Sequence, residues 1–137
     1  MRELFQSSNH VTVFNTAEFA QNGSLHDRAF CINVMSAIPL SAERERVLAQ
    51  ILNSLEPRGS CLFVVQYRNS DFNRMANLPI AEPWHDGFLL KSLRGYSFYA
   101  LISPAALAKL LGQAGFEVVN QQLNQGSVYM WAIRPET

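Results

Sequence analysis

Two neighbouring residues, His85 and Asp86, form the best candidate acid–base pair in this chain, within the segment EPWHDGF. An imidazole titrates near neutral pH, and an adjacent carboxylate can orient it or raise its pKa. Neighbouring residues on an extended segment point to opposite sides, however, so the two side chains need not touch. We interpret both residues as candidates for substrate binding, and His10 and His26, which flank strand-like segments, as incidental.

Other common catalytic and metal sites have no matching pattern here. The three histidines and two cysteines lack the spacing of metal ligands, so we predict no metal. The sequence also contains no G-x-S-x-G nucleophile motif and no phosphate-binding P-loop. Cys31 and Cys61 lie in apolar, strand-like runs, which favours buried free thiols over a disulfide and indicates a cytoplasmic location.

The composition restricts the possible partners. The chain has 137 residues, of which 48% are hydrophobic, so we expect one domain with a real core. The 11 basic and 11 acidic residues cancel, which gives no strong signal for nucleic-acid binding. Charged residues make up only 16%, which favours a covered surface and a homodimer, or a protein partner. No apolar run is long enough to span a bilayer, and the N-terminal residues lack the apolar core of a secretion signal.

Strand-like and helix-like runs alternate along most of the chain. Ser41 is expected to cap a helix whose apolar residues recur at helical spacing, with Arg44 and Arg46 on its solvated face. The continuous apolar run at 29–35 is typical of a strand that is covered on both faces. The expected elements are strands at 10–15, 29–35 and 61–67, a helix from Ser41 that stops at 56–60, a helix at 103–116 with Ser103 as its cap, and an antiparallel pair at 117–123 and 127–133.

The middle segment, 68–100, is less regular and contains Asn, Asp and Pro residues that break helices and strands. A segment of this length between two regular elements is usually a lid, a binding loop or an interface. Its aromatic part includes Tyr96, which could line an apolar pocket or stack on a base. Packing in the core or at an interface is the alternative.

Several of these motifs together resemble one family. Asp27 begins the first run, Ile38 and Pro39 close a loop, and ERVLAQILNSLEPRGSCLFVV and SPAALAKLLGQAGFEVV follow in order. This order and spacing are similar to the C-terminal half of class I S-adenosylmethionine (SAM)-dependent methyltransferases. The complete sheet of the family has the strand order 3-2-1-4-5-7-6. The resemblance implies a truncated form of this Rossmann-like α/β fold, with a mostly parallel sheet that ends in an antiparallel hairpin.

One motif of the family has no counterpart. The family binds its cofactor at a Gly-rich turn after the first strand, where the absence of side chains lets the backbone approach the ligand. This chain has no G-x-G-x-x-G, and its first residues look like the end of the second helix and the third strand. We therefore expect the first two strands to be missing. The strand at 10–15 would then pair beside 29–35 or with a second copy of the chain.

The resemblance also implies positions for a site at the carboxyl ends of the strands. The cofactor would contact Thr16, Ala17, Asn33 and Met35, although Thr16 could instead serve a turn or cap and Asn33 could be a structural amide. Ser36, Tyr67 and Arg68 lie where the substrate is expected, with Arg68 either pairing with an anionic group or remaining an ordinary surface residue. The full set of substrate candidates is Ser36, Tyr67, Arg68, His85, Asp86 and Tyr96.

Three functions are compatible with these features. The first is a SAM-dependent methyltransferase-like domain that lacks the usual cofactor-binding half and is not active alone, with SAM binding weak or lost. The second is a noncatalytic homodimeric binding or assembly module, or a partner subunit of a complete methyltransferase. The third is an enzyme of unrelated chemistry that uses a pocket near His85.

Overall fold

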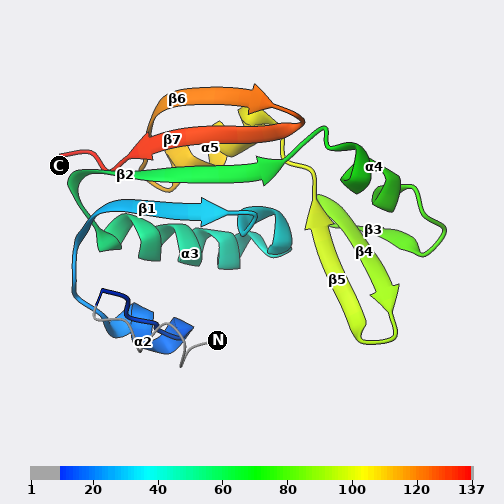
Figure 1. Ribbon diagram of the computed structural model, residues 1–137, viewed down its shortest axis with the longest axis horizontal. Coiled ribbons are helices and arrows are strands. Elements are labelled where there is room, and N and C mark those ends of the chain that lie inside the picture. Colours follow the sequence, from blue (N-terminus) through cyan, green and yellow to red (C-terminus); the bar gives the residue numbers. More distant parts are fainter. Residues whose placement is uncertain (1–9, 137) are drawn as a thin grey trace.

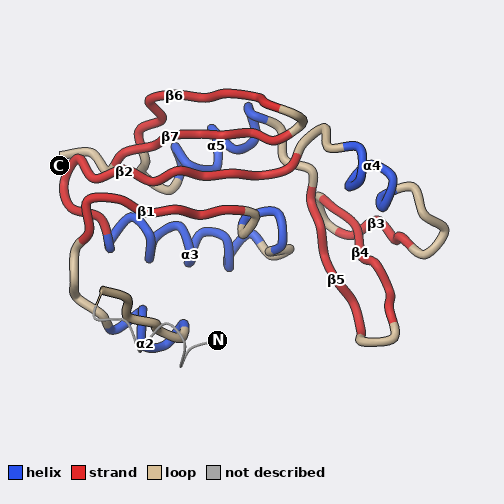
Figure 2. The backbone as a smooth tube through the Cα atoms, in the orientation of Figure 1, coloured by secondary structure: helices blue, strands red, loops and turns tan. Residues whose placement is uncertain are grey.

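The computed structural model describes residues 10–136. They form a four-stranded sheet of order β1-β2-β7-β6 and a three-stranded sheet of order β3-β4-β5 (Figures 1 and 2). The elements in chain order are α2 (Thr16–Gln21), β1 (His26–Ile32), the 3-10 helix η1 (Met35–Ala37), α3 (Ser41–Ser54), β2 (Leu55–Gln66), α4 (Ser70–Ala76), β3 (Ala81–Trp84), β4 (Gly87–Ser92), β5 (Gly95–Ala100), α5 (Pro104–Gln113), β6 (Glu117–Asn124) and β7 (Ser127–Ile133).

Three of the four strands in the larger sheet run in the same direction. β1 is parallel to β2, and β7 is antiparallel to both β2 and β6. The result is a mixed α/β sheet that ends in an antiparallel hairpin, so the predicted fold class is confirmed. The hairpin turns through Gln125 and Gly126, both with positive φ (50° and 83°), as a tight two-residue turn requires.

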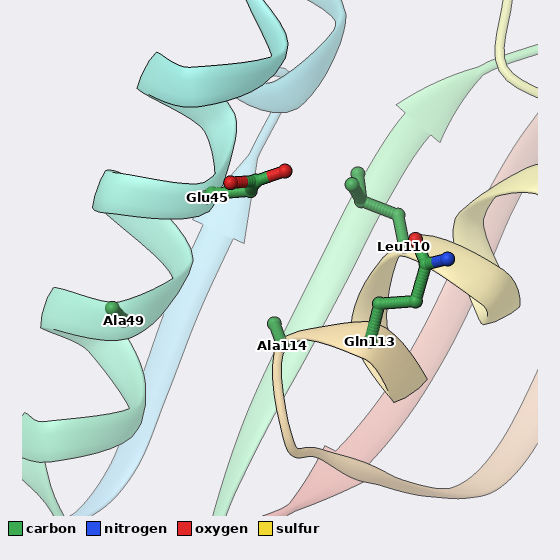
Figure 3. A pocket seen from close by; sticks show the side chains of 5 residues that line it. All are labelled: Glu45, Ala49, Leu110, Gln113 and Ala114. Atoms are coloured by element: carbon green, nitrogen blue, oxygen red, sulfur yellow. The ribbon is translucent and has the colours of Figure 1, made fainter.

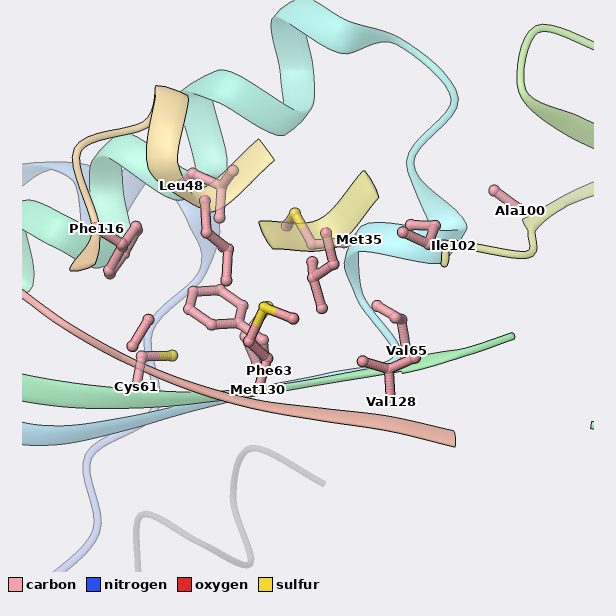
Figure 4. Close-up of a cluster of buried hydrophobic side chains, with 14 of the residues drawn as sticks. Met35, Leu48, Cys61, Phe63, Val65, Ala100, Ile102, Phe116, Val128 and Met130 are labelled. Atoms are coloured by element: carbon pink, nitrogen blue, oxygen red, sulfur yellow. The ribbon is translucent and has the colours of Figure 1, made fainter. Parts of the chain in front are cut away.

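The hydrophobic core lies on one face of this sheet, beneath α3 and α5 (Figure 4). Leu48 of α3 and Leu107 and Leu111 of α5 are fully buried against it. Phe63 of β2 meets Phe116 edge to face, with ring centroids 5.2 Å apart. The sheet contributes alternate residues of each strand to this face, in register: Cys31, Cys61, Phe63, Val65, Val128, Met130 and Ala132.

The two covering helices begin in different ways. At α5 the Ser103 hydroxyl accepts a hydrogen bond from the Ala106 amide at 3.1 Å, and Pro104 takes the first helical position, as predicted. At α3 the predicted cap is wrong, because Leu40 occupies the cap position and makes no side-chain hydrogen bond, while Ser41 is already helical. The helix does end just before 56–60, at Ser54, but β2 begins directly after it at Leu55, earlier than the expected strand at 61–67.

The strand expected at 10–15 does not form. Instead Asn15 caps α2: its side chain accepts from the Glu18 amide at 2.8 Å, and the Glu18 carboxylate accepts from the Asn15 amide at 2.9 Å. Among the described residues β1 pairs only with β2, so 10–15 does not fill the place beside it. The second face of β1 is not covered either, because Phe30 and Ile32 are 65% and 53% exposed.

The segment 68–100 is more regular than its sequence indicates. It holds α4 and the antiparallel strands β3, β4 and β5. Some expected breakers occupy caps and turns, such as Asn69 and Asp86, whereas Pro83 lies within the short strand β3. Asn69 caps α4, and Phe72 of this helix packs on Tyr99 of β5 with centroids 5.3 Å apart. None of the helices in residues 10–136 is long and apolar enough to cross a membrane.

Candidate functional site

A chain of polar side chains closes the carboxyl edge of the larger sheet. The Gln66 amide donates to Asn33 Oδ1 at 3.1 Å, and the Ser127 hydroxyl donates to Gln66 Oε1 at 2.9 Å. Asn33 directly follows β1 with φ 58°, a left-handed conformation that Asn tolerates better than most residues. The Asn33 side chain therefore links the ends of neighbouring strands, as a structural amide would.

Other predicted residues gather at the same edge. Met35 and Ser36 form η1 and are almost fully buried, with Met35 part of the hydrophobic core. The backbone amides of Tyr67 and Arg68 both donate to the Gly126 carbonyl at 2.9 Å. The exposed Arg68 guanidinium lies over the Tyr67 ring, 5.1 Å from its centroid. Arg68 is the positive charge at this edge that an anionic ligand could contact.

Gly126 brings the β6–β7 turn close to the end of β2. A Cβ at this position would lie 2.6 Å from the Arg68 carbonyl carbon and 2.7 Å from the Asn69 nitrogen. Only glycine fits without moving one of the two backbones. The turn thus fixes the backbone from which the Tyr67 and Arg68 side chains project.

Arg44 was expected on the solvated face of its helix, and this expectation is wrong. Its guanidinium is buried, not solvated, and it pairs with both carboxylate oxygens of Asp86, at 2.5 and 3.2 Å. Its Nε also donates to the carbonyls of Met35 and Ile38, at 3.1 and 2.7 Å. One side chain thereby connects the loop after β1 to the β3–β4 turn.

This pairing changes the interpretation of His85 and Asp86. They form the two-residue turn between β3 and β4, and the Asp86 carboxylate is engaged by Arg44. The His85 ring lies against Trp84, with centroids 4.4 Å apart, and His85 has φ 52°. The structure thus uses Asp86 as an anchor of the turn, and the exposed imidazole remains available to a ligand.

Three predicted residues lie away from the carboxyl edge. Thr16 and Ala17 begin α2, whose later residues Phe19 and Ala20 line a pocket with the C-terminal part of α3. Tyr96 is 65% exposed on β5, opposite Lys91 and near the far end of the β4–β5 hairpin (Figure 1). The structure therefore does not bring these three together with Asn33, and their predicted ligand contacts stay predictions.

A groove between α3 and α5 was not anticipated. One pocket, of about 320 Å³, has Glu45 and Ala49 of α3 facing Leu110, Gln113 and Ala114 across the gap (Figure 3). A second, of about 260 Å³, shares Leu110 and Gln113 and adds residues that reach the Arg44–Asp86 pair. The groove lies between the helices that cover the sheet. Small residues at facing helix positions, Ala49 and Ala114, are the signal that could have indicated it.

The two cysteine thiols of the core are shielded from solvent, with Cys31 4% and Cys61 0% exposed. Burial raises the pKa of the Cys31 thiol to about 11. It raises the pKa of the Cys61 thiol to about 12, with a smaller contribution from the nearby Cys31. Both cysteines are free, as predicted. No group of three or more His, Cys, Asp or Glu residues within 10–136 is placed to hold a metal ion.

Comparison with solved structures assigns the fold. PH0226 protein from Pyrococcus horikoshii OT3 matches 97% of this chain with a TM-score of 0.73 at 14% identity, and the match covers 64% of that protein. A SAM-dependent methyltransferase from Clostridium acetobutylicum matches 97% with a TM-score of 0.67 at 9% identity, over 69% of its length. The chain has the fold of the class I SAM-dependent methyltransferases.

Two further matches define how far the likeness extends. The 1,6-didemethyltoxoflavin-N1-methyltransferase of Burkholderia thailandensis, solved with S-adenosylhomocysteine bound, has a TM-score of 0.64 at 18% identity, and 55% of it is covered. By sequence, the chain is 26% identical over 105 residues to the uncharacterized Escherichia coli protein YmfD. The chain spans 46% of that protein, which is less than half of its length. No family model matches the sequence.

Proposed function

We propose that this chain is the substrate-side half of a SAM-dependent methyltransferase-like domain and does not bind SAM or transfer a methyl group by itself. The observation that carries the proposal is the strand arrangement. The order β1-β2-β7-β6, with β7 reversed, corresponds to strands 4-5-7-6 of the methyltransferase order. The first three strands of that order have no counterpart among the described strands.

The lack of a Gly-rich turn supports the absence of an independent cofactor site. In the family the Gly-rich turn follows the first strand, which has no counterpart among the described strands, and the sequence contains no G-x-G-x-x-G. A phosphate- or nucleoside-binding backbone usually relies on glycine for close approach. The Asn33 side chain, a candidate for cofactor contact, is already bonded to Gln66. A cofactor-binding half would have to come from another polypeptide or another part of the same one.

The groups that remain free at this edge favour substrate contact. Arg68 is exposed and Tyr67 is half-buried beneath it, and the His85 imidazole lies on the β3–β4 turn, which Arg44 ties to the loop after β1. In the proposed arrangement Arg68 pairs with an anionic group, and Tyr67 and His85 supply an aromatic wall and a proton-accepting nitrogen. The Arg44–Asp86 pair holds the turn that carries His85.

Calorimetric titration of the purified chain with SAM and with S-adenosylhomocysteine tests the proposal. We expect no binding heat up to about 1 mM ligand, which corresponds to a binding free energy weaker than about −4 kcal/mol. Micromolar affinity would contradict it and show that the residues present build a cofactor site. Should heat appear, Arg68→Gln would show whether the exposed charge at this edge carries it, because this variant leaves the strand order intact.

A second function, a noncatalytic assembly module or partner subunit, is favoured by a different observation. The face of the larger sheet opposite the core exposes Phe30 and Ile32 next to Trp131, which indicates a covering partner. We further propose a cytoplasmic location, because two free buried thiols are typical of proteins in a reducing compartment.

A further inference from the structure

We infer that two copies of this chain pack face to face through the uncovered face of the larger sheet, with a twofold axis parallel to the strands. The inference specifies the assembly module named above. It does not depend on whether the chain has lost cofactor binding.

The strand register defines the rows of side chains on this face. Phe30, Leu62 and Trp131 lie side by side across β1, β2 and β7, with Asn120 of β6 at the end of the row. The neighbouring row likewise has three hydrophobic or aromatic residues and one amide: Ile32, Val64, Tyr129 and Gln122. These rows contain no charged residue.

Much of this apolar surface is open to water. Phe30 is 65% exposed and Ile32 is 53% exposed, while Tyr129 and Trp131 are 36% and 37% exposed; on β2 between them, Leu62 is half-buried and Val64 is 5% exposed. Side chains of this size, grouped in two adjacent rows, form a contiguous patch of the kind that marks a protein interface. The helices that cover the sheet, α3 and α5, both lie on its other face.

A third row explains the choice of a second copy and the direction of its axis. Arg28 of β1 and Glu117 of β6 lie at opposite ends of the row that also holds Ser60 and Ile133. A twofold axis parallel to the strands places each β1 over the partner's β6. Arg28 then faces the partner's Glu117, and the reverse pair forms by symmetry. Neither residue forms an ion pair within the described part of the chain.

The same operation brings the apolar centres together. Leu62 lies over the partner's Trp131, and Val64 over the partner's Tyr129, while Phe30 and Ile32 cover the partner's Asn120 and Gln122 at the rim. Two twisted sheets commonly stack in this way, about 10 Å apart with their strands within about 30° of parallel. Pairing of two β1 edges, by contrast, would extend the sheet and leave both apolar rows exposed.

Sedimentation equilibrium of the full chain tests the interface. We expect a dimer at about 100 µM protein, and Trp131→Glu, near the centre, should weaken association at least about 100-fold by burying an unpaired charge. Phe30→Glu, at the rim, should weaken it about tenfold. Leu93→Glu is the control, because Leu93 is fully exposed at the tip of the β4–β5 hairpin and should leave the dimer unchanged. Circular dichroism verifies that each variant remains folded.

A charge exchange tests the axis. Arg28→Glu places two like-charged pairs at the interface and should weaken the dimer about tenfold, with a loss that shrinks at high salt. The double variant Arg28→Glu with Glu117→Arg should restore the wild-type constant. A dimer that tolerates Phe30→Glu, or a double variant that is no stronger than Arg28→Glu alone, would overturn the inference.

The outcome for the proposed function is read separately. A monomer at about 100 µM that does not bind SAM would overturn the dimer and leave the proposed function standing. A dimer that binds SAM at micromolar concentration would support the proposed interface and overturn the proposed function. A monomer that dimerises only with a different protein would assign the face to that protein and also overturn the inference.

Discussion

The buried Arg44 should be worth far more to stability than a surface arginine. In Arg44→Met the apolar stem remains, but the carbonyls of Met35 and Ile38 lose their shared donor, at 3.1 and 2.7 Å in the wild type. Leaving a buried acceptor unsatisfied costs about 1–3 kcal/mol. Asp86 is 50% exposed and regains water, so it adds at most about 1 kcal/mol. We expect the free energy of unfolding to fall by about 3 kcal/mol.

Two further variants separate the parts of this cost. Asp86→Asn keeps the shape of the turn but leaves the buried Arg44 guanidinium, 9% exposed, without a counter-charge, so it should cost about 1–3 kcal/mol. Arg46→Met is the matched control on the same helix. Its side chain is 47% exposed and pairs only with Glu43 three residues earlier, so it should cost less than about 0.5 kcal/mol.

Urea denaturation, followed by circular dichroism and by tryptophan fluorescence, measures these differences. In the double variant Arg44→Met with Asp86→Asn, we expect a coupling energy of about 1 kcal/mol, since only the ion pair is shared by the two residues. If Arg44→Met and Arg46→Met destabilise equally, Arg44 is a surface residue and the proposed anchoring of the β3–β4 turn is wrong.

The other predictions concern the core, the turn and pH. Gly126→Ala should destabilise the fold by at least about 2 kcal/mol, because φ is 83° and a Cβ would meet the Arg68 backbone at 2.6 Å. Gly112 lies in open space within α5, so Gly112→Ala should stabilise the fold by about 0.5–1 kcal/mol. Thermal unfolding compares the two variants. Leu111→Ala should cost about 3 kcal/mol in urea, since Leu111 is fully buried, and a loss below about 1 kcal/mol would argue against this core. The pKa values of the two cysteine thiols are raised from 9.0 to about 11 and 12, so unfolded chains lose thiol protons first as the pH rises. The free energy of unfolding should therefore be constant below pH 9 and should fall above it by about 1.4 kcal/mol per pH unit for each thiol. Urea denaturation at a series of pH values measures this fall for the wild type and for Cys31→Ala. If the fall with pH were the same in both proteins, burial of the Cys31 thiol would not be its cause.

Local signals in the sequence predicted much of the fold. The apolar spacing of α3, the Ser103–Pro104 start of α5 and the turn at Gln125–Gly126 each depend on neighbouring residues, and each element is present in the structure. The mixed sheet followed from the order of these elements. Features set by residues close in sequence were thus within reach of pattern reasoning.

Features set by distant residues were not. Arg44 is four residues before Leu48 and so lies on the buried stripe of α3, but its partner is 42 residues away, and charge alone favoured a solvated position. The strand expected at 10–15 had strand-like composition but lacks a paired neighbour, and Asn15 and Glu18 provide a helix cap instead. Strand propensity depends on such neighbours more than helix propensity does.

The candidate site residues were likewise predicted well where their position depends on nearby residues, and poorly where it depends on distant ones. Asn33, Ser36, Tyr67 and Arg68 do follow β1 and β2 at the carboxyl edge, because parallel strands end at one edge of a sheet, while their ligand contacts stay predictions. Tyr96 does not, since the β4–β5 hairpin carries it away from this edge. The sequence alone could not predict that separation, because the hairpin was not recognised.

The proposal that this chain does not bind SAM by itself is tested most directly by an NMR titration of the isotopically labelled chain with S-adenosylhomocysteine. Backbone amides of Asn33, Ser36 and Arg68 report on the edge where the fold family places its methyl donor. We expect no saturable shift of these signals up to about 1 mM ligand. Saturable shifts with a micromolar midpoint, centred on these residues, would contradict it, because the chain would then hold the cofactor without a second half.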